Sequence, residues 1–230
     1  MGLVHVTGKP LEVKEAGKHK VVDLAAKINP GTSVLNKYTD FILSTKQDGG
    51  NSMTATGAVH RGPDEIKVYL PPSKQAIVFN DEIAISWVRD PKTKTYLVRF
   101  NSMFGDELEK LEVQDTTVFI NLAGSKFSNE DNILVEISSK AEPKKVSEPI
   151  MLKRLSTGDK KRINSTLADI SKHTSEKTAL NQLVLASFYE NHGLLIDAAT
   201  AYQTAISLAP TVAQYRTEYA RFIARNGMKN

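Results

Sequence analysis

The 230-residue sequence predicts a multi-domain protein in which two small all-β modules, of barrel or sandwich type, precede a helical module of about four helices. Three observations support this prediction. Apolar residues alternate with polar ones over the first two thirds, they recur every three or four positions in the last third, and proline-containing segments separate the parts. The expected boundaries are 1–72 and 73–140 for the β modules, 141–155 for a linker, and 156–230 for the helices.

The first β module is predicted from short alternating runs with turn residues between them. Ile66, Val68 and Leu70 alternate with Lys67 and Tyr69 until Pro71-Pro72 ends the run. Period-two spacing of this kind is typical of strands and hairpins. Residues 1–72 are therefore expected to form a small antiparallel barrel or sandwich.

One stretch of this module resembles a known family. Residues 28–34 read Ile-Asn-Pro-Gly-Thr-Ser-Val, and the apolar residues 41–43 and then Gly62-Pro63 follow them. This arrangement resembles the periplasmic β domain of the FecR-like sigma-regulator proteins. The resemblance implies a signalling module outside the cytoplasmic membrane, and a generic β module is the alternative.

The second β module has a more regular pattern, with turn signals at 90–92, 104–106 and 128–132. Its expected strand faces are formed by Ile83, Ile85 and Trp87, by Tyr96, Val98 and Phe100, by Val118, Ile120 and Leu122, and by Ile133, Val135 and Ile137. This spacing is typical of an all-β sandwich. The Ile-x-Trp and Tyr-x-Val-x-Phe strands resemble those of a fibronectin type III or immunoglobulin-like domain without a disulfide. Trp87 is expected in the core.

The helical module is predicted from residue 157 onward. Ile163, Leu167 and Ile170 recur at helical spacing, two helices are expected at about 176–191 and 195–208, and a fourth at about 212–226. His192-Gly193 joins the second helix to the third, because glycine can adopt the left-handed conformation that ends a helix.

Residues 179–212 resemble a single tetratricopeptide repeat. The family pattern maps onto Gln182-x2-Leu185-Ala186-x2-Tyr189, then Ala198-x3-Tyr202, then Pro210, although Gln182 stands where the family prefers a large aromatic residue. The resemblance implies that the first helix of the hairpin binds a partner protein. The matching surface consists of Leu180, Leu183, Ser187, Glu190 and Asn191.

Composition and motifs favour a non-enzymatic protein without a cofactor. The sequence has no cysteine, and its five histidines are not placed at the spacing of metal ligands. It contains neither a phosphate-binding glycine loop nor a nucleophile elbow. The basic residues between Lys144 and Arg162 lack interleaved aromatics, so a solvated charge run is expected rather than a nucleic-acid site.

The sequence therefore predicts a protein-interaction or scaffold protein, of a bacterial cell envelope, that binds another protein, a peptide or a second copy of itself. One alternative is a FecR-like envelope signalling regulator. Another is a carbohydrate-binding or enzymatic role on the sandwich. No apolar run is long enough for a transmembrane segment. The expected location is the periplasm or envelope if an export signal preceded Met1, and otherwise the cytoplasm.

Overall fold

A computed structural model describes residues 2–4, 10–12, 65–71, 75–171 and 176–228. Near the N-terminus, β1 (Gly2–Val4) pairs in antiparallel fashion with β2 (Pro10–Glu12), with Leu3 opposite Leu11. The remaining part of the predicted first module up to residue 64, with the FecR-like stretch 28–34, lies outside the described residues. The prediction for that module therefore stays a prediction.

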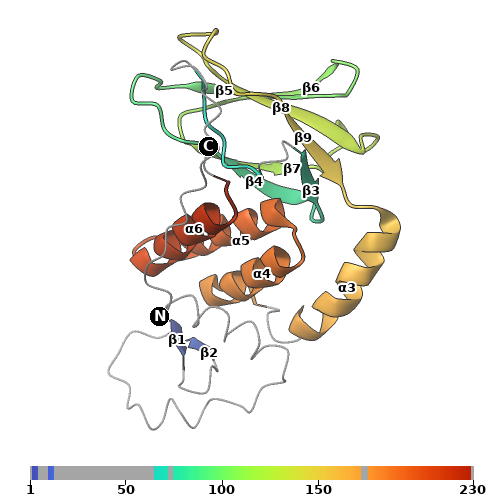
Figure 1. The fold of residues 1–230 in the computed structure, drawn as a ribbon, viewed down its shortest axis with the longest axis vertical. Coiled ribbons are helices and arrows are strands. Elements are labelled where there is room, and N and C mark those ends of the chain that lie inside the picture. The colour runs from blue at the N-terminus through green and yellow to red at the C-terminus, as the bar shows by residue number, and fades with distance from the viewer. Residues whose placement is uncertain (1, 5–9, 13–64, 72–74, 172–175, 229–230) are drawn as a thin grey trace.

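Residues 75–154 form a β-sandwich of two sheets (Figure 1). Its strands are β3 (Gln75–Val78), β4 (Glu82–Ser86), β5 (Tyr96–Asn101), β6 (Glu107–Val113), β7 (Thr117–Asn121), β8 (Asn132–Ser139) and β9 (Ile150–Arg154). The larger sheet has the order β3-β9-β8-β5-β6, and the smaller consists of β4 and β7. All neighbouring strands are antiparallel except β3 and β9, which run parallel.

The core of the sandwich follows from the period-two pattern of its strands. Tyr96, Val98 and Phe100 on β5 are fully buried, and the residues between them are half-buried. Alternation of this kind places one face of each sheet against the other. Trp87 is 1% exposed and contacts Tyr96 edge to face, with ring centroids 5.3 Å apart, so the expectation that Trp87 is a core residue is confirmed.

Two segments belong to the sandwich, although the predicted boundaries placed them outside it. Residues 150–154, within the predicted linker 141–155, form β9, which lies between β3 and β8. Ile66, Val68 and Leu70, placed by the sequence in the first module, are buried in the core of the sandwich. Val68 bridges Trp87 beyond the end of β4. The proline-containing stretch 141–149 lies between β8 and β9. The sequence predicted a linker there because composition alone does not distinguish a linker from a loop within a fold.

In the part of the chain that the structure describes, four helices follow the strands: α3 (Thr157–Ser171), α4 (Ala179–Asn191), α5 (Leu195–Leu208) and α6 (Ala213–Arg225). The predicted succession of β structure and then about four helices is confirmed. Thr178 caps α4 by accepting a hydrogen bond from the Asn181 N–H. Gly193 has φ 71° and joins α4 to α5. The tetratricopeptide and immunoglobulin resemblances stay predictions.

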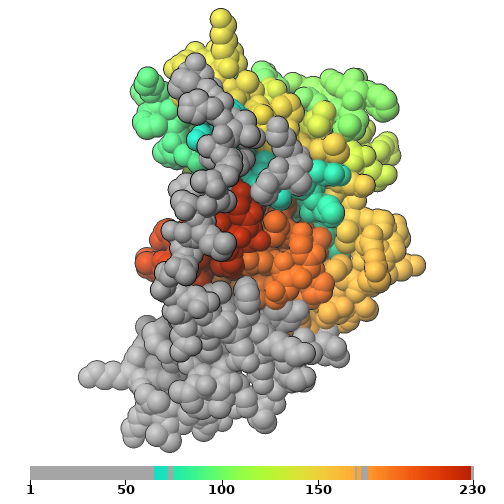
Figure 2. Space-filling model, viewed as in Figure 1, coloured from blue at the N-terminus to red at the C-terminus, as the bar shows by residue number. Residues whose placement is uncertain are grey.

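The helices pack directly against the sandwich (Figures 1 and 2). Among the described helices, α5 packs most closely against β3 and β4. Ile196 of α5 belongs to the core of the sandwich, whereas Phe79, which follows β3, belongs to the core of the helices. The two cores therefore meet at the start of α5. Within the part of the chain that the structure describes, no helix has the length and apolar character needed to span a membrane.

Candidate functional site

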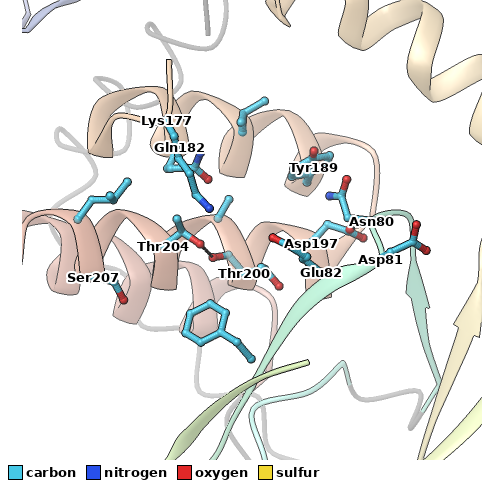
Figure 3. Close-up of a pocket in the computed structure, with 14 residues that line it drawn as sticks. Asn80, Asp81, Glu82, Lys177, Gln182, Tyr189, Asp197, Thr200, Thr204 and Ser207 are labelled. Carbon is cyan, nitrogen blue, oxygen red and sulfur yellow. Dashed lines mark hydrogen bonds between the residues drawn. The ribbon is translucent and has the colours of Figure 1, made fainter. Parts of the chain in front are cut away.

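The candidate site is an open groove between helices α4 and α5 and the smaller sheet, with a volume of about 670 Å³ (Figure 3). Its lining combines polar, charged and apolar groups from all three parts. The residues are Asn80, Asp81, Glu82 and Phe119 from the β region, Lys177, Gln182, Leu185 and Tyr189 from α4 and its N-terminal approach, and Asp197, Thr200, Ala201, Thr204, Ser207 and Leu208 from α5. The groove thus exists only because the helices lie against the sheet.

One face of α5 holds the two walls of this groove together. Asp197 accepts hydrogen bonds from the N–H groups of Phe79 at 2.9 Å and Asn80 at 2.7 Å. One turn later, the Thr200 hydroxyl accepts from the Ala84 N–H at 2.8 Å. Residues three apart on a helix lie on the same face, so Asp197 meets the turn between β3 and β4, and Thr200 meets the edge of β4. Thr200 thereby satisfies a donor that a neighbouring strand would otherwise satisfy.

The same face continues with Gln203, whose amide donates to the Ser86 hydroxyl at 3.2 Å. The carboxyl group of Asp197 is the most deeply buried of these groups, since the residue is 1% exposed. Burial raises the pKa of Asp197 to about 6, although the N–H groups of Asn80 and Phe79 oppose the shift. This carboxyl therefore serves as an acceptor that holds α5 to the sheet.

The rim of the groove offers groups that are free to contact a ligand. Phe119 is 52% exposed and Leu208 is 45% exposed, although both are large apolar side chains. Lys177 and Glu82 are exposed charges that also line the groove. Apolar anchors with a few polar and charged neighbours are what peptide-binding grooves present. The rim can therefore receive a short segment with apolar side chains.

The structure places the five residues predicted to bind a partner outside this groove. Leu183 and Ser187 are buried at 5% and 0% exposure, Leu180 is half-buried, and Asn191 is exposed. Glu190 is engaged in an ion pair: its carboxylate accepts two hydrogen bonds of 2.6 Å from Arg225 and one of 2.7 Å from Asn226. The predicted surface of α4 is thus mostly covered by its own fold.

The groove instead uses Gln182, Leu185 and Tyr189, which follow each other at helical spacing on another face of α4. In the sequence these residues mark the repeat pattern, and the predicted binding surface did not include them. Their spacing was visible in the sequence, but which face the sandwich leaves open was not.

Part of the predicted basic run is paired in the fold. Arg154 pairs with Asp81 at 2.9 Å, Lys145 with Asp90 at 2.9 Å, and Arg162 with Asp159. The side chains of Lys145 and Arg154 are only 12% and 17% exposed, so these two residues are structural and not solvated as expected. Within the described ranges, no group of three or more His, Asp or Glu side chains is placed to hold a metal ion.

Comparisons with known proteins do not assign the chain to a family. No family model matches the sequence, and a search of curated proteins finds no match either.

Proposed function

We propose that this protein is a non-enzymatic interaction or scaffold protein that binds a short segment of a partner protein in the groove between α4, α5 and the smaller sheet. The observation that supports the proposal is the lining of that groove. Exposed Phe119 and Leu208 flank a row of hydroxyl and amide groups, and Lys177 supplies a positive charge. Glu82 supplies an exposed negative charge, so this lining favours a peptide with apolar anchors, an acidic residue near Lys177 and a basic residue near Glu82.

The proposal keeps the helical hairpin as the binding module but moves the binding surface. A tetratricopeptide-like hairpin at 179–212 remains part of it, with Gln182, Leu185 and Tyr189 as the contact face of α4 in place of Leu183 and Ser187. The envelope location and the FecR-like signalling alternative rest on the resemblance of residues 28–34. The carbohydrate-binding alternative loses its best candidate, because Trp87 is buried at 1% exposure.

The proposal can be tested with a displayed library of random peptides selected on the folded chain. We expect enriched peptides that carry two apolar residues and an acidic one, and that bind the variants Leu208→Glu and Lys177→Glu at least tenfold more weakly. Both substituted side chains are exposed, so the fold should be retained.

The matched control is Phe104→Glu, because Phe104 is 94% exposed in the turn between β5 and β6 and lies outside the groove. It should bind the selected peptides as the unchanged chain does. The proposal fails if the library yields no enriched peptide, or if the groove variants bind the enriched peptides as tightly as the control variant.

A further inference from the structure

The sandwich has strand edges of different character. The edge of β4 that faces away from β7 is covered, since Thr200 accepts from the Ala84 N–H and the Tyr69 N–H donates to the Ser86 carbonyl at 2.9 Å. The outer strand β6 carries charges at four of its seven positions, Glu107, Glu109, Lys110 and Glu112. Charges on an edge strand prevent pairing with other chains. Both edges are therefore protected.

The outer strand β7 lacks this protection. Its sequence, Thr-Val-Phe-Ile-Asn, has no charged residue, and among the described residues it pairs with β4 alone. Phe119 at its centre is 52% exposed. An uncharged edge strand with an exposed aromatic side chain is a template for strand pairing.

The ladder between β4 and β7 shows which backbone groups point outward. The Trp87 N–H donates to the Thr116 carbonyl at 3.0 Å, and the Leu122 N–H donates to the Asp81 carbonyl at 2.8 Å. In an antiparallel ladder, hydrogen-bonded positions alternate along each strand. Residues 116, 118, 120 and 122 therefore face β4, and the backbone groups of Thr117, Phe119 and Asn121 face outward, with the Asn121 carbonyl also accepting from the Gly124 N–H at 3.4 Å.

This outward pattern is symmetric about Phe119. Two β7 strands can pair in antiparallel fashion with a two-fold axis at Phe119. The two Phe119 residues then exchange N–H···O=C bonds, and Thr117 of each copy pairs with Asn121 of the other. The register sets Asp115 opposite Ala123, so no like charges oppose each other. The two Phe119 side chains then lie side by side on one face of the joined sheet. The edge is thus complementary to itself.

We propose that two copies of this chain associate through β7, antiparallel and centred on Phe119. A five-residue strand pair covers less surface than the roughly 1,200 Å² of a standard stable interface. The dimer is therefore weak and forms in a concentration-dependent way. This association is separate from peptide binding in the groove, although Phe119 borders both.

Sedimentation equilibrium over a wide concentration range tests the proposal. The unchanged chain should fit a monomer–dimer equilibrium, and Phe119→Lys should weaken dimerisation at least about tenfold, or 1.4 kcal/mol, because two lysines would meet at the axis. Phe104→Lys is the matched control, since it places the same charge on an exposed aromatic position in the β5–β6 turn. Its dimerisation should equal that of the unchanged chain.

A second measurement uses the absence of cysteine from the sequence. Phe119→Cys should form a cross-linked dimer rapidly with a short bis-maleimide, whereas Phe104→Cys should not. A chain that stays monomeric at all concentrations overturns the proposal. So does a Phe119→Lys variant that dimerises like the control, or equal cross-linking at positions 119 and 104. Circular dichroism of each variant checks that the fold is retained.

Discussion

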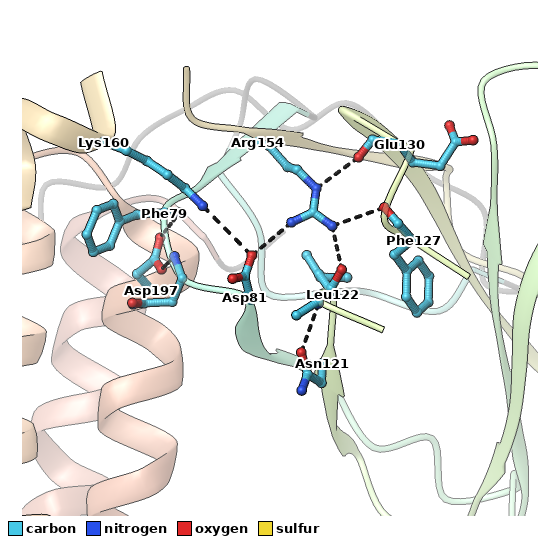
Figure 4. Close-up of polar contacts among 11 residues, drawn as sticks. Phe79, Asp81, Asn121, Leu122, Phe127, Glu130, Arg154, Lys160 and Asp197 are labelled. Carbon is cyan, nitrogen blue, oxygen red and sulfur yellow. Dashed lines mark hydrogen bonds and ion pairs between the residues drawn. The ribbon is translucent and has the colours of Figure 1, made fainter. Parts of the chain in front are cut away.

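The β-sandwich and the helical layer each bury a charged side chain that binds backbone groups, but they do so in different ways. In the sandwich, the Arg154 guanidinium donates to the carbonyls of Leu122, Phe127 and Glu130 and pairs with the Asp81 carboxylate (Figure 4). In the helical layer, Asp197 accepts from two backbone N–H groups, and no positively charged partner is described for it.

This difference shows how the sandwich and the helical layer are connected. Arg154 joins loops within the sandwich, and its charge is balanced by Asp81 at 2.9 Å. Asp197 joins one part to the other, since it lies on α5 and its donors follow β3. A buried carboxyl without a counter-ion has a raised pKa because burial disfavours its charged form. These contacts of Asp197 form the joint between the two parts, and the joint is therefore one place where pH acts on this fold.

The largest expected effect is at that joint. Asp197→Ala leaves the buried N–H of Phe79 and the half-buried N–H of Asn80 without their acceptor, and the free energy of unfolding should fall by about 3 kcal/mol. Urea unfolding measures the change. Asp115→Ala is the control, because Asp115 is 79% exposed and its ion pair with Arg89 should contribute less than about 1 kcal/mol. Equal losses in the two variants would contradict the role of the joint.

A smaller loss is expected within the sandwich. Arg154→Met removes the donor from three loop carbonyls, but these loops lie near the surface and water can replace part of the donor's role. We expect a loss of about 2 kcal/mol in thermal unfolding. Arg154→Lys should recover less than half of it, since an ammonium group cannot reproduce the planar fork of a guanidinium. Full recovery by lysine would show that charge alone matters at this position.

Helix α6 should be affected next. Arg225 donates twice to Glu190, whose side chain is 8% exposed, and thereby ties the end of α6 to the end of α4. Arg225→Met leaves this carboxylate with Asn226 as its remaining described donor, and the free energy of unfolding should fall by about 1 kcal/mol. The double variant Arg225→Met with Glu190→Gln should recover part of the loss. Additive losses in urea unfolding would argue against coupling between the two residues.

The last expected effect is a pH dependence that distinguishes the two parts. Burial raises the pKa of Asp197 from its ordinary 3.8 to about 6, so the folded chain binds this proton more tightly than the unfolded chain. The contribution of Asp197 to the free energy of unfolding therefore falls as pH rises from about 4 to about 6. Asp197→Asn should lack this fall when unfolding is measured at several pH values.

A sandwich residue should show the opposite sign. Hydrogen bonds from Lys145 and Thr93 lower the pKa of Asp90 to about 2, so its contribution is present above pH 4 and is lost as pH falls toward 2. Asp90→Asn should remove that loss and keep the fall between pH 4 and 6. If both variants changed the same pH range, the assignment of the two groups would be wrong.

Much of the fold could be predicted because periodicity reports burial within one element. The spacing of Ile133, Val135 and Ile137 predicted a strand, and that of Ile163, Leu167 and Ile170 predicted a helix; both elements form. Strand β9 was missed because its residues follow a proline-rich, charged stretch that also suits a linker. Its position in the sheet depends on β3 and β8, which a local pattern does not report.

The candidate site was predictable only in part. The hairpin of α4 and α5 was expected, but its open face was not, because the burial of Leu183 and Ser187 depends on how the helices pack. The groove residues Gln182, Leu185 and Tyr189 share a helical face in any α-helix formed by this sequence. That this face borders a groove required the position of the sheet.

The order of β structure and helices and the apolar faces that form the cores follow from the sequence alone, because both depend on residues close together in the chain. The joint, the groove and the open edge of β7 arise only when the chain is folded. Asp197 and Phe79 are 118 residues apart, and their contact leaves no periodic signal. Backbone donors and acceptors are common to nearly all residues, so their long-range partners emerge only when the chain is folded.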